Sequence, residues 1–240
     1  MNLKTPLYSS ISFLELFWAL SCPSVQVEAQ LNVGFYSKSC PSAEQIVKEE
    51  VMKGFMSNNS IAPGLVRMHF HDCFVRLIFF SLLSFQGCDG SVLIDSTSSN
   101  IAEKDSVVNN PSLQGFNVID NAKTRLESQC AGVVSYADIL AFVARDNIET
   151  TRRLAYDVPA GRRNGWVSLA SEALQDFPTP TLNFDQHTQN FANKGLTQEE
   201  MVTLSESHKI GQSHCTSFNR RLYNFNGTNG PDPTLDPNMT

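Results

Sequence analysis

The sequence predicts an all-α fold with long irregular loops. Several stretches carry apolar residues at helical spacing, and none shows the period-two alternation of a half-buried strand. The chain has 240 residues, 41% hydrophobic and 18% charged, so it can bury a substantial core in one domain, or in one domain with a lobe. The connections are rich in Asn, Ser, Gly and Pro.

The first predicted helix covers residues 41–56, PSAEQIVKEEVMKGFM. Ser42 and Gln45 have the spacing of a capping box, in which each side chain binds the backbone N–H of the other residue. Val47 and Val51 lie four residues apart, as on one stripe of an amphipathic helix. The stretch is therefore expected to start at Ser42 and to bury its valine face.

Three more helices are expected in the middle of the chain. They cover residues 62–74, 116–130 and 134–146. The second places Val118 and Leu126, with the alanine between them, on one face, and the third is apolar enough to be more deeply buried.

The last predicted helix covers residues 196–211. Thr197 and Glu200 form a capping box, and Leu204 and His208 share a face. Beyond it, NFNGTNGPDPTLDPNMT consists of turn residues, so no helix is expected to close the fold after this point.

Residues 1–29 predict a secretory signal peptide. Lys4 precedes the apolar run SFLELFWAL, and Val27 and Ala29 supply the small residues before Gln30. A buried N-terminal helix is the alternative. No other apolar run reaches the roughly 18 residues of a membrane span. Net charge is −6 with Lys and Arg scattered, which argues against nucleic-acid binding.

A secreted chain would fold in an oxidising compartment, where cysteines pair. The five cysteines after the signal peptide cannot all pair within one chain, which leaves open a free thiol, an intermolecular bond or a partner outside this sequence. These cysteines are Cys40, Cys73, Cys88, Cys130 and Cys215.

Two neighbouring groups of side chains indicate chemistry. Arg67 and His71 are four residues apart and face one side of a helix, which suits charge stabilisation beside proton transfer. Asp72 follows directly, and the later GCDGS places Asp89 and Ser91 among small residues. Carboxylates, a hydroxyl and loop carbonyls are the ligands that calcium prefers.

Several motifs together resemble the secretory plant haem peroxidases, class III of the plant peroxidase superfamily. The resemblance implies a haem-peroxidase-like helical fold with haem b and calcium, which reduces hydrogen peroxide with small phenolic electron donors. It also implies a monomer that acts outside the cell or in the cell wall, with the vacuole as an alternative, and that has neither nucleic-acid nor membrane partners. The motifs are LVRMHFHDCFV, GCDGSVL, CPSAEQIV, VSYADIL, VPAGRRNG and LSESHKIGQSHC.

The resemblance assigns roles on the distal side of the haem. His71 matches the base that takes a proton from hydrogen peroxide, and Arg67 matches the group that stabilises the developing charge. Phe70 would form a wall of the pocket. Asn109 matches the amide that accepts from the distal imidazole, and Glu103 would connect this network to the calcium site.

The same resemblance implies the calcium ligands. They are the side chains of Asp72, Asp89 and Ser91 and the carbonyl groups of Val75 and Gly87.

On the other side of the haem, His208 matches the proximal iron ligand. Pro178 matches a residue at the entrance used by aromatic donors. The implied disulfides are Cys40–Cys130 and Cys73–Cys88.

Residues 76–86, RLIFFSLLSFQ, interrupt the most diagnostic motif. The family pattern CFVxGCD keeps its two cysteines close, whereas this chain separates Val75 from Gly87. Phe, Leu and Ser have pyrimidine-rich codons, and a Gln codon can end a splice acceptor. We interpret the segment as an intron-derived insertion or a faulty gene model, so transcripts should join Val75 almost directly to Gly87.

Other departures bear on activity. Lys209 stands where the family has a threonine ligand of a second, proximal calcium, and an ammonium group cannot ligate a cation. Calcium is therefore expected at the distal site only. Residues 30–240 are expected to be a partial peroxidase domain, incomplete at the C-terminus, where the family partner of Cys215 and the carboxylate that accepts from the proximal histidine would lie. Reduced or absent activity follows.

The sequence leaves two alternatives. The first is an inactive secreted remnant that binds haem or calcium. The second is a zinc site of His69, His71 and Cys73, which is disfavoured because residues two apart point to different faces of a helix.

Overall fold

The computed structural model describes residues 31–76, 87–152, 154–236 and 238. The predicted signal peptide and residues 77–86 of the predicted insertion lie outside the described residues. The described chain is helical and has no strand; isolated bridges join Asn32 with Ala160 and Thr97 with Asn100. The prediction of an all-α fold is confirmed.

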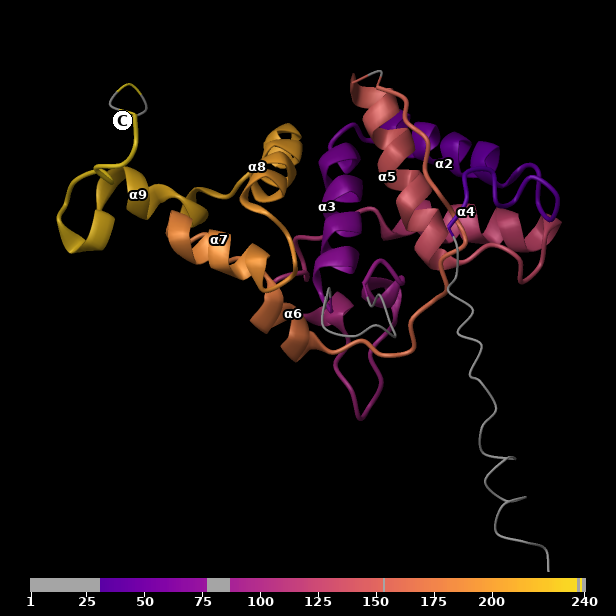
Figure 1. Ribbon diagram of the computed structural model, residues 1–240, viewed down its shortest axis with the longest axis horizontal. Coiled ribbons are helices and arrows are strands. Elements are labelled where there is room, and N and C mark those ends of the chain that lie inside the picture. Colours follow the sequence, from indigo (N-terminus) through magenta and orange to yellow (C-terminus); the bar gives the residue numbers. More distant parts are fainter. Residues whose placement is uncertain (1–30, 77–86, 153, 237, 239–240) are drawn as a thin grey trace, which may run out of the picture.

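Four helices form a bundle in the N-terminal part of the described chain. Helix α5 packs against α2 and α3, and α2 also packs against α4 (Figure 1). The helices are α2 (Ala43–Ser57), α3 (Ile61–Phe74), α4 (Phe116–Gln129) and α5 (Tyr136–Arg152).

Shorter helices follow on the other side of α3 (Figure 1). Helices α7 and α8 pack against each other, while α6 packs against the loop that precedes α4. They are α6 (Ala170–Asp176), α7 (Phe184–Ala192), α8 (Gln198–Ser207) and α9 (Asn219–Tyr223). The structure also contains single 3₁₀ turns. Between α3 and α4 lie η1 (Ser91–Leu93) and η2 (Glu103–Asp105), between α8 and α9 lie η3 (His208–Ile210) and η4 (Cys215–Ser217), and η5 (Phe225–Gly227) follows α9.

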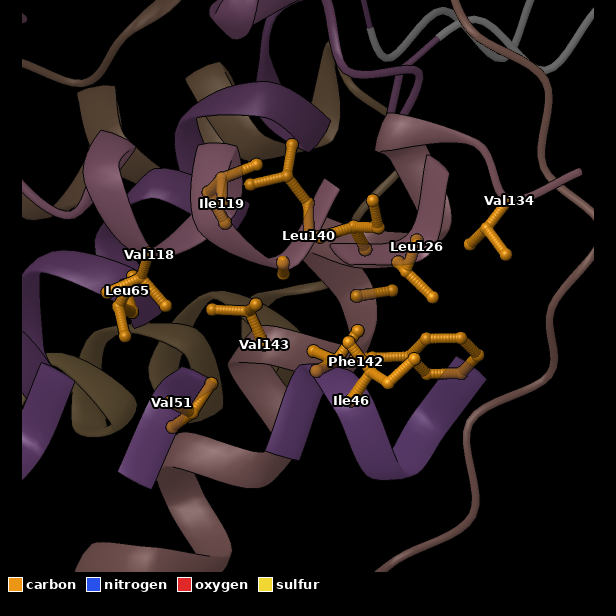
Figure 2. Close-up of a cluster of buried hydrophobic side chains, with 14 of the residues drawn as sticks. Ile46, Val51, Leu65, Val118, Ile119, Leu126, Val134, Leu140, Phe142 and Val143 are labelled. Atoms are coloured by element: carbon orange, nitrogen blue, oxygen red, sulfur yellow. The ribbon is translucent and has the colours of Figure 1, made fainter. Parts of the chain in front are cut away.

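The larger hydrophobic core lies inside the four-helix bundle (Figure 2). Leu65 of α3, Ile119 of α4 and Val143 of α5 are each 0% exposed. Full burial of such a side chain contributes about 1.5–3 kcal/mol. The predicted stripes on α2 and α4 face this core, and α5 is buried over most of its length.

A second, smaller core lies between the end of α3 and helices α6 to α8. Phe74 from α3, Phe177 from the end of α6 and Phe191 from α7 are buried there with Met201 of α8. Helix α3 therefore touches both cores, because Met68 faces the first and Phe74 the second. The candidate catalytic residues Arg67 and His71 of α3 lie in the sequence between or beside these two positions.

The two predicted capping boxes had different outcomes. The box of Thr197 and Glu200 is present at the start of α8. The box predicted at Ser42 is wrong, because the Ser42 side chain makes no cap hydrogen bond. Its hydroxyl donates instead to Gln129 Oε1 at the end of α4, and Gln45 donates to Glu49. A tertiary contact replaced the local one.

Helices α6, α7 and α9 were not predicted. Helix α7 did carry a signal, because Asn183 and Gln186 form a capping box in the structure. After α9 the described residues contain the 3₁₀ turn η5 and no α-helix, as the turn-rich sequence predicts.

Two disulfides join distant segments. Cys40, before α2, is bonded to Cys130 at the end of α4, and Cys73 of α3 is bonded to Cys88. Cys215 is free and exposed. Within the described ranges, no helix combines the length and apolar character needed to cross a membrane.

Candidate functional site

A chain of hydrogen bonds runs from α3 into the loop before α4. Arg67 Nε donates to His71 Nε2 over 3.1 Å, and His71 Nδ1 lies 2.6 Å from Asn109 Oδ1. Asn109 Nδ2 donates to the carbonyl oxygen of Glu103 over 2.7 Å. The helical spacing of Arg67 and His71 makes the first contact, and the loop brings in the other two residues.

The partners fix the tautomer of His71. Asn109 donates to a carbonyl, so its Oδ1 faces the imidazole and accepts the Nδ1 proton. Nε2 then carries the lone pair and accepts from Arg67. Arg67 is held in place by the Val108 carbonyl oxygen, 3.0 Å from Nη2.

Burial makes His71 a weak base. Its side chain is 7% exposed, and desolvation, with the positive charge of Arg67, lowers its pKa from 6.5 to about 3. The hydrogen bond to Asn109 opposes this shift without reversing it. Burial also lowers the pKa of Arg67. The imidazole is therefore neutral at ordinary pH and can accept a proton.

A loop next to α3 collects acidic side chains. Asp72 is 0% exposed, and its Oδ2 accepts from Gly90 N (2.9 Å) while its Oδ1 accepts from Val92 N (3.3 Å). Asp89 Oδ1 accepts from Ser91 N over 3.1 Å. The backbone N–H groups of Gly90 and Val92 thus hold the Asp72 carboxylate against the loop.

Three oxygens in this region are buried without a partner. They are Ser91 Oγ and both carboxylate oxygens of Glu103. Burial, with the charges of Asp72 and Asp89, raises the pKa of Glu103 to about 8. The nearby Ser91 side chain opposes this rise, although its hydroxyl and the Glu103 carboxylate do not reach hydrogen-bond geometry. Burial, partly offset by the backbone N–H of Gly90, raises the pKa of Asp72 to about 7. Buried unpaired acceptors cost free energy unless a ligand satisfies them, and a hard cation such as calcium does so. These residues fit calcium.

Glycine is required where the chain approaches these ligands. Gly87 has φ +115°, and a Cβ there would lie 2.6 Å from the carbonyl oxygen of Cys73 and 3.5 Å from that of Val75. A Cβ on Gly165 would lie 2.0 Å from Asp89 Oδ2. A larger residue at position 87 would push against the backbone of Cys73, and one at position 165 would displace the carboxylate of Asp89.

His208 lies at the end of α8 on the far side of Phe70. Its Nδ1 donates to the carbonyl oxygen of Leu204 over 2.7 Å, so the predicted shared face is a direct contact. The ring centroids of Phe70 and His208 are 5.0 Å apart and edge to face. Lys209 Nζ pairs with Glu206 Oε2.

The rings leave no space for haem in this conformation. A planar macrocycle between Phe70 and His208 would need a carbon contact of about 3.5–4.0 Å on the Phe70 side, and the His208 imidazole would have to lie beyond its other face. Their centroids are 5.0 Å apart, and the ring of Phe177 lies 4.1 Å from that of His71. The described residues supply the side chains that the resemblance assigns to haem, but the arrangement does not fit the group.

The remaining candidates lie apart from these contacts. Pro178 follows Phe177 directly and is partly exposed. Ligand atoms of His69, Cys73 and Cys88 lie within 4.8 Å of one another, but both sulfurs are in a disulfide and are not thiolates. His71 turns to Asn109 instead, so the zinc alternative has no support among the described residues.

The sequence did not reveal three contributors. Phe177 contacts His71, Ser168 Oγ accepts from Glu103 N, and Gly165 makes room for Asp89. Only Phe177 carried a signal, since it precedes Pro178 in the FPTP motif. The others depend on contacts between distant segments.

Comparisons with known proteins show the family of this chain. The family profile described as Peroxidase matches residues 47–240. The chain is 65% identical over 229 residues to Peroxidase 5 of Vitis vinifera, covering 95% of this chain and 67% of the relative. It is 49% identical over 210 residues to Peroxidase 3 of Arabidopsis thaliana, covering 88% and 61%. The chain thus spans about two thirds or less of the length of these relatives. It belongs to the plant peroxidase family.

Proposed function

We propose that the protein reduces hydrogen peroxide with electrons from small phenolic donors, with low turnover in the described conformation. The observation that carries this proposal is the hydrogen-bonded chain of Arg67, His71 and Asn109. Membership of the plant peroxidase family, which implies haem b and calcium, supports it.

In this proposal His71 accepts the proton and Arg67 stabilises the negative charge. Asn109 holds the Nδ1 proton of His71, which leaves the Nε2 lone pair to accept a proton from hydrogen peroxide. Because Arg67 Nε now donates to that lone pair, Arg67 must first turn toward the substrate. Its guanidinium then stabilises negative charge on oxygen. The haem implied by the family does not fit the described arrangement.

Calcium is proposed at the distal site alone. The side chains of Asp72, Asp89 and Ser91 and the carbonyls of Val75 and Gly87 would bind it, and Glu103 would connect it to Asn109. The buried, unpartnered oxygens of Ser91 and Glu103 support this assignment. At the proximal site, the ammonium group of Lys209 would repel a cation.

The remaining proposals concern setting and substrate. Phenolic donors would approach near Pro178. The protein would act as a secreted monomer, after removal of residues 1–29, and residues 76–86 would be an insertion in the calcium loop.

The activity test is peroxide-dependent oxidation of guaiacol by the full chain with added haemin and calcium. His71→Ala should lower the initial rate by about 10²- to 10⁴-fold, as for loss of a general base. Asn109→Ala should cost about 10- to 100-fold, because Asn109 acts through His71. The exposed His214→Ala is the control and should keep the starting rate. Equal rates for the His71 and His214 variants would refute the assignment.

A calcium-binding protein without turnover is the second candidate. One observation favours it: the acidic loop is assembled while the haem space is closed. In that case calcium would raise the melting temperature, and the His71→Ala variant and the unaltered chain would give the same background oxidation rate.

A further inference from the structure

Two phenylalanine rings lie between His71, the candidate base, and His208, the candidate iron ligand. Phe177 lies against His71 with ring centroids 4.1 Å apart, and Phe70 lies against His208 at 5.0 Å. The two phenylalanine rings are 6.3 Å from each other. We call this pair the aromatic closure.

The second hydrophobic core supports the aromatic closure. Phe74 stacks near Phe177 at 6.3 Å, and it also contacts Phe70 and Phe191, each at 4.9 Å. Phe177 is 8% exposed. The closed arrangement thus removes apolar surface from water, which stabilises it in the absence of any ligand.

Ion pairs hold α6 in this position. Arg76, at the end of α3, donates to Glu172 Oε2 over 2.6 Å, and its backbone N–H donates to Asp176 Oδ2. Lys194, after α7, pairs with Asp176 at 2.6 Å. These contacts keep the last residue of α6 beside the end of α3, and therefore keep Phe177 near His71.

We propose that the aromatic closure competes with haem for the same space. Phe177 is the movable member, because it follows a seven-residue helix and has extended backbone angles (φ −69°, ψ 137°) before Pro178. Phe70 sits within α3, which both cores hold. The inference rests on the proposed function, and it names Phe177 as the residue that sets how readily the site opens.

We expect haemin to bind more weakly when a larger fraction of the molecules has the aromatic closure formed. When a competent state is only partly populated, the apparent dissociation constant rises by the inverse of its fraction. Shortening Phe177 should therefore tighten binding, although the same change removes buried apolar surface and lowers the melting temperature.

The test is a haemin titration of the full chain, followed by the Soret band, with melting temperatures recorded in parallel. Phe177→Ala should bind haemin about tenfold more tightly than the unaltered chain, because the closed state is removed. Phe177→Leu is a milder variant that should bind more tightly in the same direction if Phe177→Ala fails to fold. Phe191→Ala is the matched control: it shortens a buried ring of the same core that contacts Phe74 and neither histidine. It should lower the melting temperature without tightening binding.

The outcomes separate this inference from the proposed function. Unchanged haemin affinity in both Phe177 variants, or equally tighter haemin binding by Phe191→Ala, would overturn the aromatic closure. This conclusion would hold with or without guaiacol oxidation. Loss of the tight binding in Phe177→Ala on adding His208→Ala would support binding at this site, and its persistence would count against it. Tight binding in Phe177→Ala without any guaiacol oxidation would uphold the closure and refute the peroxidase proposal.

Discussion

His71, the proposed base, is held by contacts from three directions. Arg67 approaches from its own helix, Asn109 from the loop before α4, and Phe177 from the end of α6. The first two fix the tautomer, and burial among all three lowers the pKa. The imidazole of His71 is therefore neutral at ordinary pH.

Acid should destabilise the fold through His71. Its folded pKa is about 3, below the unfolded value of 6.5, so the unfolded state binds more protons. The contribution is fully present above pH 6.5 and is lost as pH falls toward 3. Between pH 7 and pH 4 the unaltered chain should lose roughly 2–3 kcal/mol more stability than His71→Gln, measured by urea unfolding. Parallel curves for the two proteins would contradict the buried neutral imidazole.

Calcium binding should strengthen with rising pH. The pKa of Asp72 is raised to about 7 and that of Glu103 to about 8, so calcium must displace protons below these values. Without calcium these two groups act oppositely to His71: they favour the folded state at low pH, and that stability is lost as pH rises from their ordinary pKa values of 3.8 and 4.5 toward 7 and 8. The calcium-induced rise in melting temperature should therefore be larger at pH 8.5 than at pH 6.

Matched variants locate the calcium effect. Asp89→Asn should remove most of the rise, whereas Asp95→Asn changes an exposed carboxylate paired with Lys104 and should keep it. A rise that survives in Asp89→Asn would place the cation elsewhere.

At the scale of elements, α3 and α8 illustrate two ways of specifying a helix. In α3, Pro63 lies in the first turn, where its missing N–H costs no helical hydrogen bond, and both cores then hold the helix. Helix α8 buries little beyond Met201, so its N-terminal cap matters more.

The cap of α8 gives a direct comparison. Thr197→Ala removes the hydroxyl that accepts from Glu200 N and should destabilise the protein by about 1 kcal/mol. Ser42→Ala alters the serine that makes no cap bond, so only its exposed bond to Gln129 is lost, and the cost should stay below about 0.5 kcal/mol. Thermal unfolding of both variants measures the difference. Equal costs would show that the local cap does not decide the stability of α8.

At the scale of the whole molecule, two cores meet at α3. Cys40–Cys130 joins α2 to α4 around the larger core across a sequence separation of 90. Cys73–Cys88 spans 15 residues beside the proposed calcium ligands. The distal site depends on both parts, because α3 carries Arg67 and His71 while α6 and the loops supply the groups that face them.

The two disulfides should differ in their contribution to stability. In the loop-entropy account, a crosslink over 15 residues contributes about 3 kcal/mol and one over 90 residues about 4.6 kcal/mol. Replacing Cys40 and Cys130 with alanine should therefore cost more than replacing Cys73 and Cys88, in urea unfolding without calcium. The reverse order would show that native contacts around Cys73 outweigh the entropy of the longer loop.

The sequence by itself determined the features that depend on near neighbours. The all-α class and the buried stripes of α2 and α4 follow from helical periodicity, and the i, i+4 contact of Arg67 with His71 follows from one helical turn. The cap at Thr197 also joins residues three apart. The resemblance added candidate roles for distant residues, without their arrangement.

Only the tertiary structure decided what distant segments do to one another. The bond of Ser42 to Gln129 replaced the expected cap, because a side chain from another helix lay within reach. The unpartnered carboxylate of Glu103 and the contact of Phe177 with His71 join residues far apart in the chain. Periodicity fixes which face of a helix is apolar, but the packing of helices fixes which side chains meet. The closed haem space is therefore a property of the packing and was not contained in the motifs.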